Sequence, residues 1–171
     1  MQAWFGFYAV IGGAAATLMG LLFVAVSMNS AAILNEARGH SRRLAEQVFQ
    51  NFVAVLSVSL VALFPSLTLR EFSLTALLVT AVSAVWVLVR LYLAFTRPLG
   101  TTSRMQLLRG QIFSLIGFGV LIFSVGRMAS NMGDNRNLLA ASAIILLLSA
   151  TRASWALLLS LAEMKVARPD G

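Results

Sequence analysis

The first charged residue of the chain is Glu36, so a long uncharged run precedes it. A membrane-spanning helix needs about 20 consecutive apolar residues, and the apolar stretch of residues 4–28 exceeds that length. A secretory signal peptide would carry a positively charged start, a shorter apolar stretch and a cleavage site. We therefore expect residues 4–28 to be a retained membrane helix.

The composition favours the same class for the rest of the chain. Hydrophobic residues make up 59% and charged residues 11% of the 171 residues, whereas an ordinary soluble domain has about 45–50% and about 25%. The charges are too few to cover a water-exposed surface, and the mean hydropathy is +0.86. We predict an all-α, polytopic membrane helix bundle in a single membrane domain, in contact with the lipid bilayer.

Four further apolar runs follow the first. Pro65 ends the second run, because proline removes a helical hydrogen bond. Thr68 and Glu71 have the spacing of a capping box, which predicts a helix start there. A four-span alternative would leave one strongly apolar run outside the bilayer. We therefore predict five spans, at about residues 4–28, 47–64, 69–95, 106–130 and 138–161.

Two polar segments lie outside these spans. Residues 29–46 are expected to form a short cytoplasmic helical connection, in which Gly39 ends one helix and Ser41 caps the next. This connection is either a solvated basic linker near lipid headgroups or a docking surface for a soluble partner. Residues 163–171 are expected to form a polar, frayed tail.

The net charge is +7, and its distribution indicates membrane orientation. Basic residues concentrate in alternate segments between the apolar runs, and no basic face carries interleaved aromatics, so nucleic acid is not expected as a partner. Cytoplasmic loops carry the excess of arginine and lysine. We predict an outside N-terminus and an inside C-terminus, from the basic residues Arg38, Arg42, Arg43, Arg97, Arg104, Arg109, Lys165 and Arg168.

The inventory of catalytic groups is nearly empty. The chain has no cysteine, its one histidine is His40, and no acidic residue falls within a predicted span. Catalysis needs a nucleophile, a base or a metal in mutual reach. We therefore expect no enzyme activity, no metal site and no cofactor.

Small residues form a stripe on the first span. Gly12, Ala16 and Gly20 lie four residues apart, and Gly13 belongs to an adjacent stripe. In lipid, such stripes let two helix backbones approach closely. The stripe packs either against another helix of the same chain or at an interface with a second copy or another membrane protein, or lines a pore.

Arg152 is the one charge that a predicted span holds at depth. Counting from Leu138 at about 1.5 Å per residue places it roughly 21 Å into a hydrocarbon core about 30 Å thick. Its side chain either reaches the cytoplasmic interface by snorkelling or coordinates an anion or pairs at an interface.

The segment from Trp4 to Asn29, with WFGFY followed by GGAAATLMGLLFVAVSMN, resembles the first span of a family of small uncharacterised bacterial membrane proteins. Some members are labelled as modulators of the FtsH protease. The resemblance implies a multi-pass protein of the bacterial inner (cytoplasmic) membrane, in contact with a membrane quality-control system.

The functional prediction is a non-enzymatic protein that acts by helix packing in a homo-oligomer or a larger membrane assembly, with a regulatory role. The alternative is a small oligomeric ion channel with anion selectivity. In that case small residues of the first or fourth span line the pore and Arg152 lies near its mouth.

The predicted topology is testable with single introduced cysteines, because the chain has none of its own. Cysteines near Ser41, Thr102 and Ala167 should react with an impermeant reagent only from the cytoplasmic side. Cysteines at Ser66 and Asn135 should react only from outside. The reverse labelling pattern would contradict the predicted orientation.

Overall fold

The computed structural model describes residues 2–30, 33, 40–64, 69–96, 101–130 and 136–166. These residues form helices and their ends, and no β-strand occurs among them, which confirms the all-helical prediction. The helices are α1 (Gln2–Met28), α3 (His40–Ala62), α4 (Leu69–Thr96), α5 (Thr101–Ala129) and α6 (Arg136–Val166).

Four of these helices are long and apolar enough to cross a membrane. The apolar stretches are Trp4–Met28, Ser41–Ala62, Arg70–Val89 and Asn137–Ala162, and α5 adds the shorter apolar stretch Ser114–Ala129. Many large apolar side chains are exposed along the described helices, as expected of a surface that faces lipid rather than water. The chain therefore has the construction of a membrane protein.

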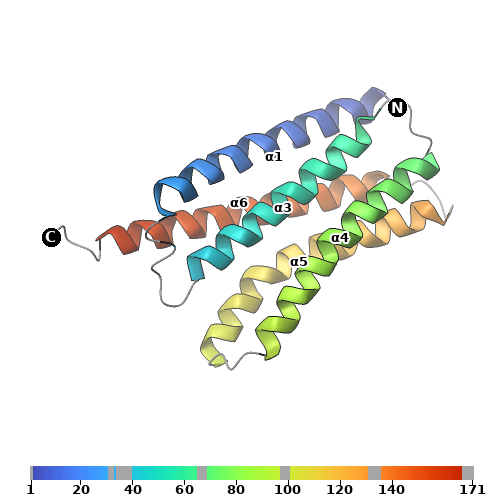
Figure 1. The fold of residues 1–171 in the computed structure, drawn as a ribbon. Coiled ribbons are helices and arrows are strands. Elements are labelled where there is room, and N and C mark those ends of the chain that lie inside the picture. Colours follow the sequence, from blue (N-terminus) through green and yellow to red (C-terminus); the bar gives the residue numbers. More distant parts are fainter. Residues whose placement is uncertain are drawn as a thin grey trace.

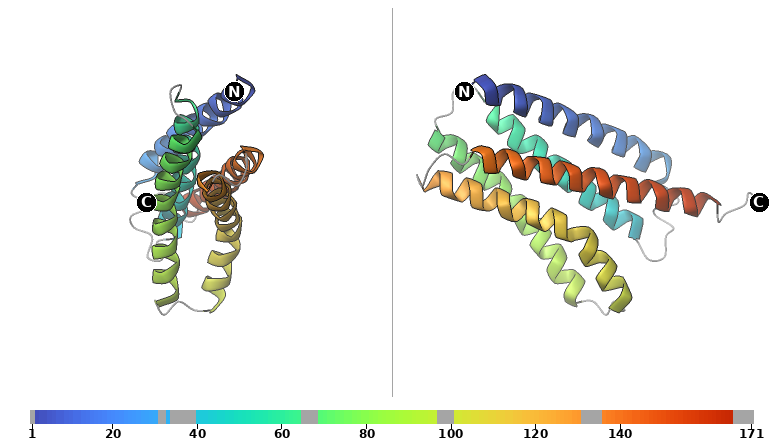
Figure 2. Two further views of the ribbon diagram at one scale, coloured as in Figure 1. Left: turned by 90° about the vertical axis from the view of Figure 1, so that its right-hand side faces the viewer. Right: turned by 180° about the vertical axis from the view of Figure 1, so that it is seen from behind.

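Four helices form a ring and the fifth lies against it (Figure 1). α3 contacts α4 and α6, and α5 contacts the same two helices, so the ring runs α3, α4, α5, α6. α1 packs outside the ring, mainly against α3 and with a smaller contact to α6. The end of α4 at Thr96 and the start of α5 at Thr101 lie apart from the other helices (Figure 1 and Figure 2).

α3 is enclosed by three neighbouring helices, α1, α4 and α6. Val48, Phe52, Val55 and Val58 recur every three or four residues and are almost completely buried. This spacing keeps their side chains on the core-facing side of a helix. The buried share of the apolar stretch is 39% in α3 and 17% in α1, so most of the surface of α1 is exposed.

The buried residues of α1 follow a seven-residue repeat. Tyr8, Gly12, Ala15 and Leu22 are buried at steps of four, three and seven residues, the spacing with which two helices pack along a continuous seam. Gly12 permits a close approach, because a Cβ built on it would lie 2.8 Å from the Cβ of Ser59 on α3.

At three ends the observed helices extend beyond the predicted membrane spans. α3 begins at His40, one residue before the cap expected at Ser41, so residues 40–46 are its first turns. The ion pair between Arg42 Nε and Glu46 Oε1 (3.1 Å) supports these turns at helical spacing. α5 begins at Thr101, and α6 continues to Val166 through residues predicted to fray. Hydropathy finds the lipid-spanning part of a helix, whereas packing and local pairs extend it beyond that part.

The predicted cap at Ser41 also differs. Ser41 lies inside α3, and its buried hydroxyl is 3.2 Å from that of Ser160 on α6. A cysteine at residue 42, whose side chain is 67% exposed, is therefore the better topology probe at this end. Thr68 and residues 31–32, 34–39, 97–100, 131–135 and 167–171 lie outside the described part of the chain.

The contact of α5 with α6 generates a stability prediction. A Cβ on Gly117 would lie 2.8 Å from Cγ and Cδ2 of Leu146, whereas a Cβ on Gly119 would meet nothing within 4 Å. Overpacking a tight core typically costs about 1–3 kcal/mol. Gly117→Ala should therefore lower thermal stability in mild detergent, and Gly119→Ala should not.

The matched double variant tests the cause. Leu146→Ala makes room beside residue 117, so the added cost of Gly117→Ala should shrink in that background. An equal cost in both backgrounds would show that Leu146 is not the residue that Gly117 accommodates.

Candidate functional site

The acidic and metal-ligating side chains are few among the described residues. No group of three or more His, Cys, Asp or Glu residues that could hold a metal ion occurs among them. The described carboxylates are at helix ends: Glu46 pairs with Arg42 near the start of α3, and Glu71 lies in the first turn of α4. Candidate functional features are therefore sought on helix faces and among buried polar groups.

The four small residues singled out on α1 divide between two faces. Gly12 is buried against Ser59, whereas Gly13, Ala16 and Gly20 are exposed. A Cβ on Gly13 or Gly20 would meet no atom within 4 Å. Packing within the chain thus accounts for Gly12 and leaves the other three residues without a role inside the protomer.

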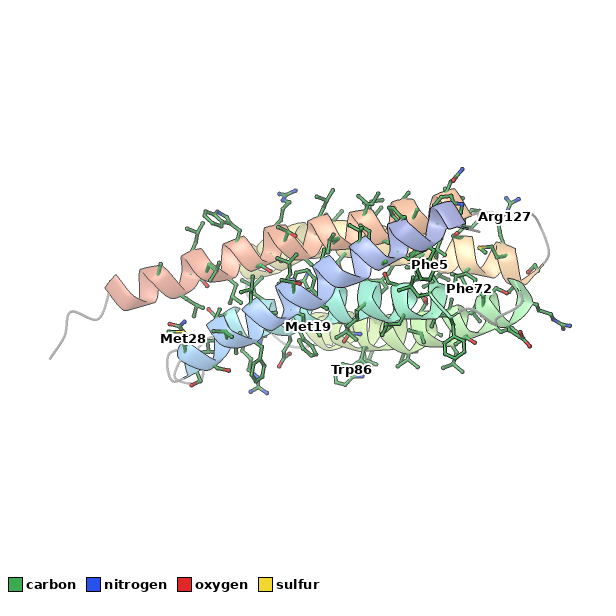
Figure 3. The ribbon with its side chains drawn as sticks, turned by 90° about the horizontal axis from the view of Figure 1, so that it is seen from above. Phe5, Met19, Met28, Phe72, Trp86 and Arg127 are labelled. Atoms are coloured by element: carbon green, nitrogen blue, oxygen red, sulfur yellow. The ribbon has the colours of Figure 1, made fainter. Side chains whose placement is uncertain are left out.

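The exposed small residues make a continuous strip, which we call the outer face of α1: Ala9, Gly13, Ala16 and Gly20. At 100° per residue, this strip is rotated by about 120° from the buried seam. In Figure 3, α1 lies in front of the other helices and no helix covers it. The outer face is therefore smooth, apolar and open along several turns.

Arg152 lies on the exterior of the bundle. It is exposed on α6, and Trp155, 65% exposed, follows three residues later. No atom of Arg152 lies within 4 Å of a Cβ built on Gly13 or Gly20, so the structure does not place Arg152 beside these glycines. Its two interpretations, snorkelling and anion or interface pairing, both remain compatible with an exposed position.

The bundle interior holds a polar contact that the sequence analysis missed. Ser114 Oγ on α5 donates a hydrogen bond of 2.6 Å to Oδ1 of Asn51 on α3, and both residues are buried. α3 and α5 are opposite members of the ring, so this bond crosses its centre. The available signal was a single asparagine among Val48, Phe52 and Val55, which occupy the core side of α3.

Four other buried hydroxyls donate to carbonyls of their own helices: those of Ser73, Thr80, Ser83 and Ser142. Thr80 donates to the carbonyl of Ala76 and Ser142 to that of Leu139, at 2.6 and 2.7 Å. In contrast, Asn51 Nδ2 and Ser59 Oγ are enclosed and have no hydrogen-bond partner among the described residues. The buried polar residues all lie on the four ring helices: Ser41, Asn51, Ser59, Ser73, Thr80, Ser83, Ser114, Ser124, Ser142 and Ser149.

Comparison of the chain with protein-family models, with curated proteins and with solved structures finds no match.

The cross-bundle hydrogen bond predicts a selective loss of stability. Ser114→Ala leaves Asn51 Oδ1 without its donor, and interhelical hydrogen bonds in membranes contribute roughly 0.6–1.7 kcal/mol. The variant should unfold at a lower temperature in mild detergent. Ser83→Ala is the matched control, because the Ser83 hydroxyl is also buried but bonds to the carbonyl of Val79 in its own helix. Equal losses in the two variants would argue against a special role for the Asn51 contact.

Proposed function

We propose that this chain is a non-enzymatic integral membrane protein that acts by helix–helix packing. The outer face of α1 joins it to a second copy in a homo-oligomer, or to another protein in a larger membrane assembly. The observation that carries this proposal is the open space around Gly13 and Gly20 on an exposed helix face.

Glycine in a helix interior is less favourable than alanine by roughly 0.5–1 kcal/mol. Gly12 and Gly117 offset that cost through close contacts with Ser59 and Leu146. Gly13 and Gly20 have no such contact within the protomer. A neighbouring helix backbone at the outer face would supply one, since helix association in lipid depends on packing of small surfaces rather than on hydrophobic transfer.

The same proposal includes the topology. Five spans, an outside N-terminus and an inside C-terminus agree with the arginine distribution and with the alternating directions of successive helices (Figure 1). The resemblance of residues 4–29 to small bacterial membrane proteins supports a location in the bacterial inner membrane.

Large-for-small substitutions on α1 test the proposal. Gly13→Leu and Ala16→Leu keep the helix apolar. At residue 13 the protomer has no atom within 4 Å of an added Cβ, so it leaves room for the larger side chain. Both should preserve insertion and protomer stability but reduce the assembled mass measured in mild detergent, because leucine separates the two backbones. Gly119→Leu is the matched control, since Gly119 is also exposed and open.

The purified mass also separates the two kinds of assembly. A homo-oligomer appears as a multiple of the chain mass, and a larger assembly as a stoichiometric co-purified protein. If both α1 variants assemble like the parent, the outer face contacts lipid only and the proposed function is wrong.

A further inference from the structure

The side-chain amide of Asn51 has a partner on only one of its two polar atoms. Oδ1 accepts from Ser114, while Nδ2 has no partner among the described residues and less than 1 Å² of accessible surface. Exchanging the two amide atoms would place Nδ2 against Ser114 Oγ and leave Oδ1 enclosed instead. Either orientation leaves one strongly polar atom unsatisfied, which is costly in an apolar interior.

Ser149 of α6 lies at the same height in the bundle as this amide. The hydroxyls of Ser41 on α3 and Ser160 on α6 are in contact, and the two helices are antiparallel. Asn51 lies ten residues beyond Ser41, about 15 Å along α3. Ser149 lies eleven residues before Ser160, about 16.5 Å along α6 in the same direction. A second contact agrees. Gly117 of α5 lies against Leu146 of α6. Ser114 is three residues before Gly117, and Ser149 is three residues after Leu146. Because the two helices are antiparallel, both serines are displaced from this contact by about 4.5 Å in the same direction.

The face of α6 that carries Ser149 is directed into the bundle. Ser149 is buried, and it precedes Ser160, which faces α3, by eleven residues, or about three helical turns. Ser149 is also one turn from Leu146, which packs against Gly117 of α5. Asn51, Ser114 and Ser149 therefore form one polar level shared by α3, α5 and α6.

We propose that this polar level binds an internal water molecule, with Asn51 as its principal ligand and Ser149 as a second. Water both donates and accepts, so it satisfies the unpartnered atom of the amide in either orientation. Buried waters typically make about three hydrogen bonds to otherwise unsatisfied polar groups. None of the buried side chains in the described residues is charged, so a neutral ligand fits this level better than an ion.

The enclosure of Asn51 Nδ2 determines how the water reaches the amide and how it exchanges with bulk solvent. Water reaches the amide through a displacement of the surrounding side chains and is then held away from the bulk solvent. This bound water would link α3, α5 and α6, whereas the direct hydrogen bond links only α3 and α5.

Solid-state NMR of the isotope-labelled parent protein in lipid vesicles tests the proposal without a substitution. Magnetisation transfer from water to the Asn51 side-chain amide should build up severalfold faster than transfer to the backbone amides of Val55 and Leu146. Those residues are fully buried at nearby positions on α3 and α6 and serve as the dry reference. Transfer to Asn51 as slow as to this reference would overturn the proposal.

Two serine variants test the second ligand. Ser149→Ala should slow the transfer to Asn51, because the water loses one of its partners. Ser142→Ala is the matched control on the same face of α6, since the Ser142 hydroxyl already donates to the Leu139 carbonyl. An unchanged transfer rate in Ser149→Ala would exclude Ser149 as a ligand.

Discussion

Close approach of helix backbones at small residues is the contact on which the rest of this bundle depends. A bilayer offers little hydrophobic driving force between apolar helices, because lipid tails are as apolar as the side chains they would replace. Gly12 lets α1 lie against Ser59 of α3, and Gly117 lets α5 lie against Leu146 of α6. The first contact joins the outer helix to the ring, and the second joins two helices of the ring, whose core includes the buried side chains of α3.

Polar and apolar side chains occupy different places in the bundle. The interior of the ring carries serine, threonine and asparagine side chains, of which four bond to carbonyls of their own helices and one, Asn51, is bonded across the centre. The exterior carries large apolar side chains and, on α1, a strip of small ones. A specific polar contact thus lies within the protomer, whereas the outer strip of α1 is open and apolar.

Hydropathy and turn residues predict the helical class and the approximate helix positions, because burial in lipid depends on local composition. The same signals cannot show which neighbour a residue faces. Gly12 and Gly13 are adjacent and identical in sequence, yet one packs on Ser59 and the other is open. Asn51 was missed for the same reason, since only the ring arrangement places Ser114 opposite it. The start of α3, in contrast, follows from the sequence to within one residue, because Ser41 was expected to cap this helix.

The central claim, that the outer face of α1 contacts another helix, is tested most directly by disulfide cross-linking in native membranes. Single cysteines placed along α1 report on the helix face that meets a second copy, and the chain has no cysteine to interfere. Cross-linked dimers should peak at residues 13, 16 and 20 and be weak at Val10 and Leu21, which are exposed on a different side. Equal cross-linking at all five positions, or a maximum at Val10 and Leu21, would contradict the account.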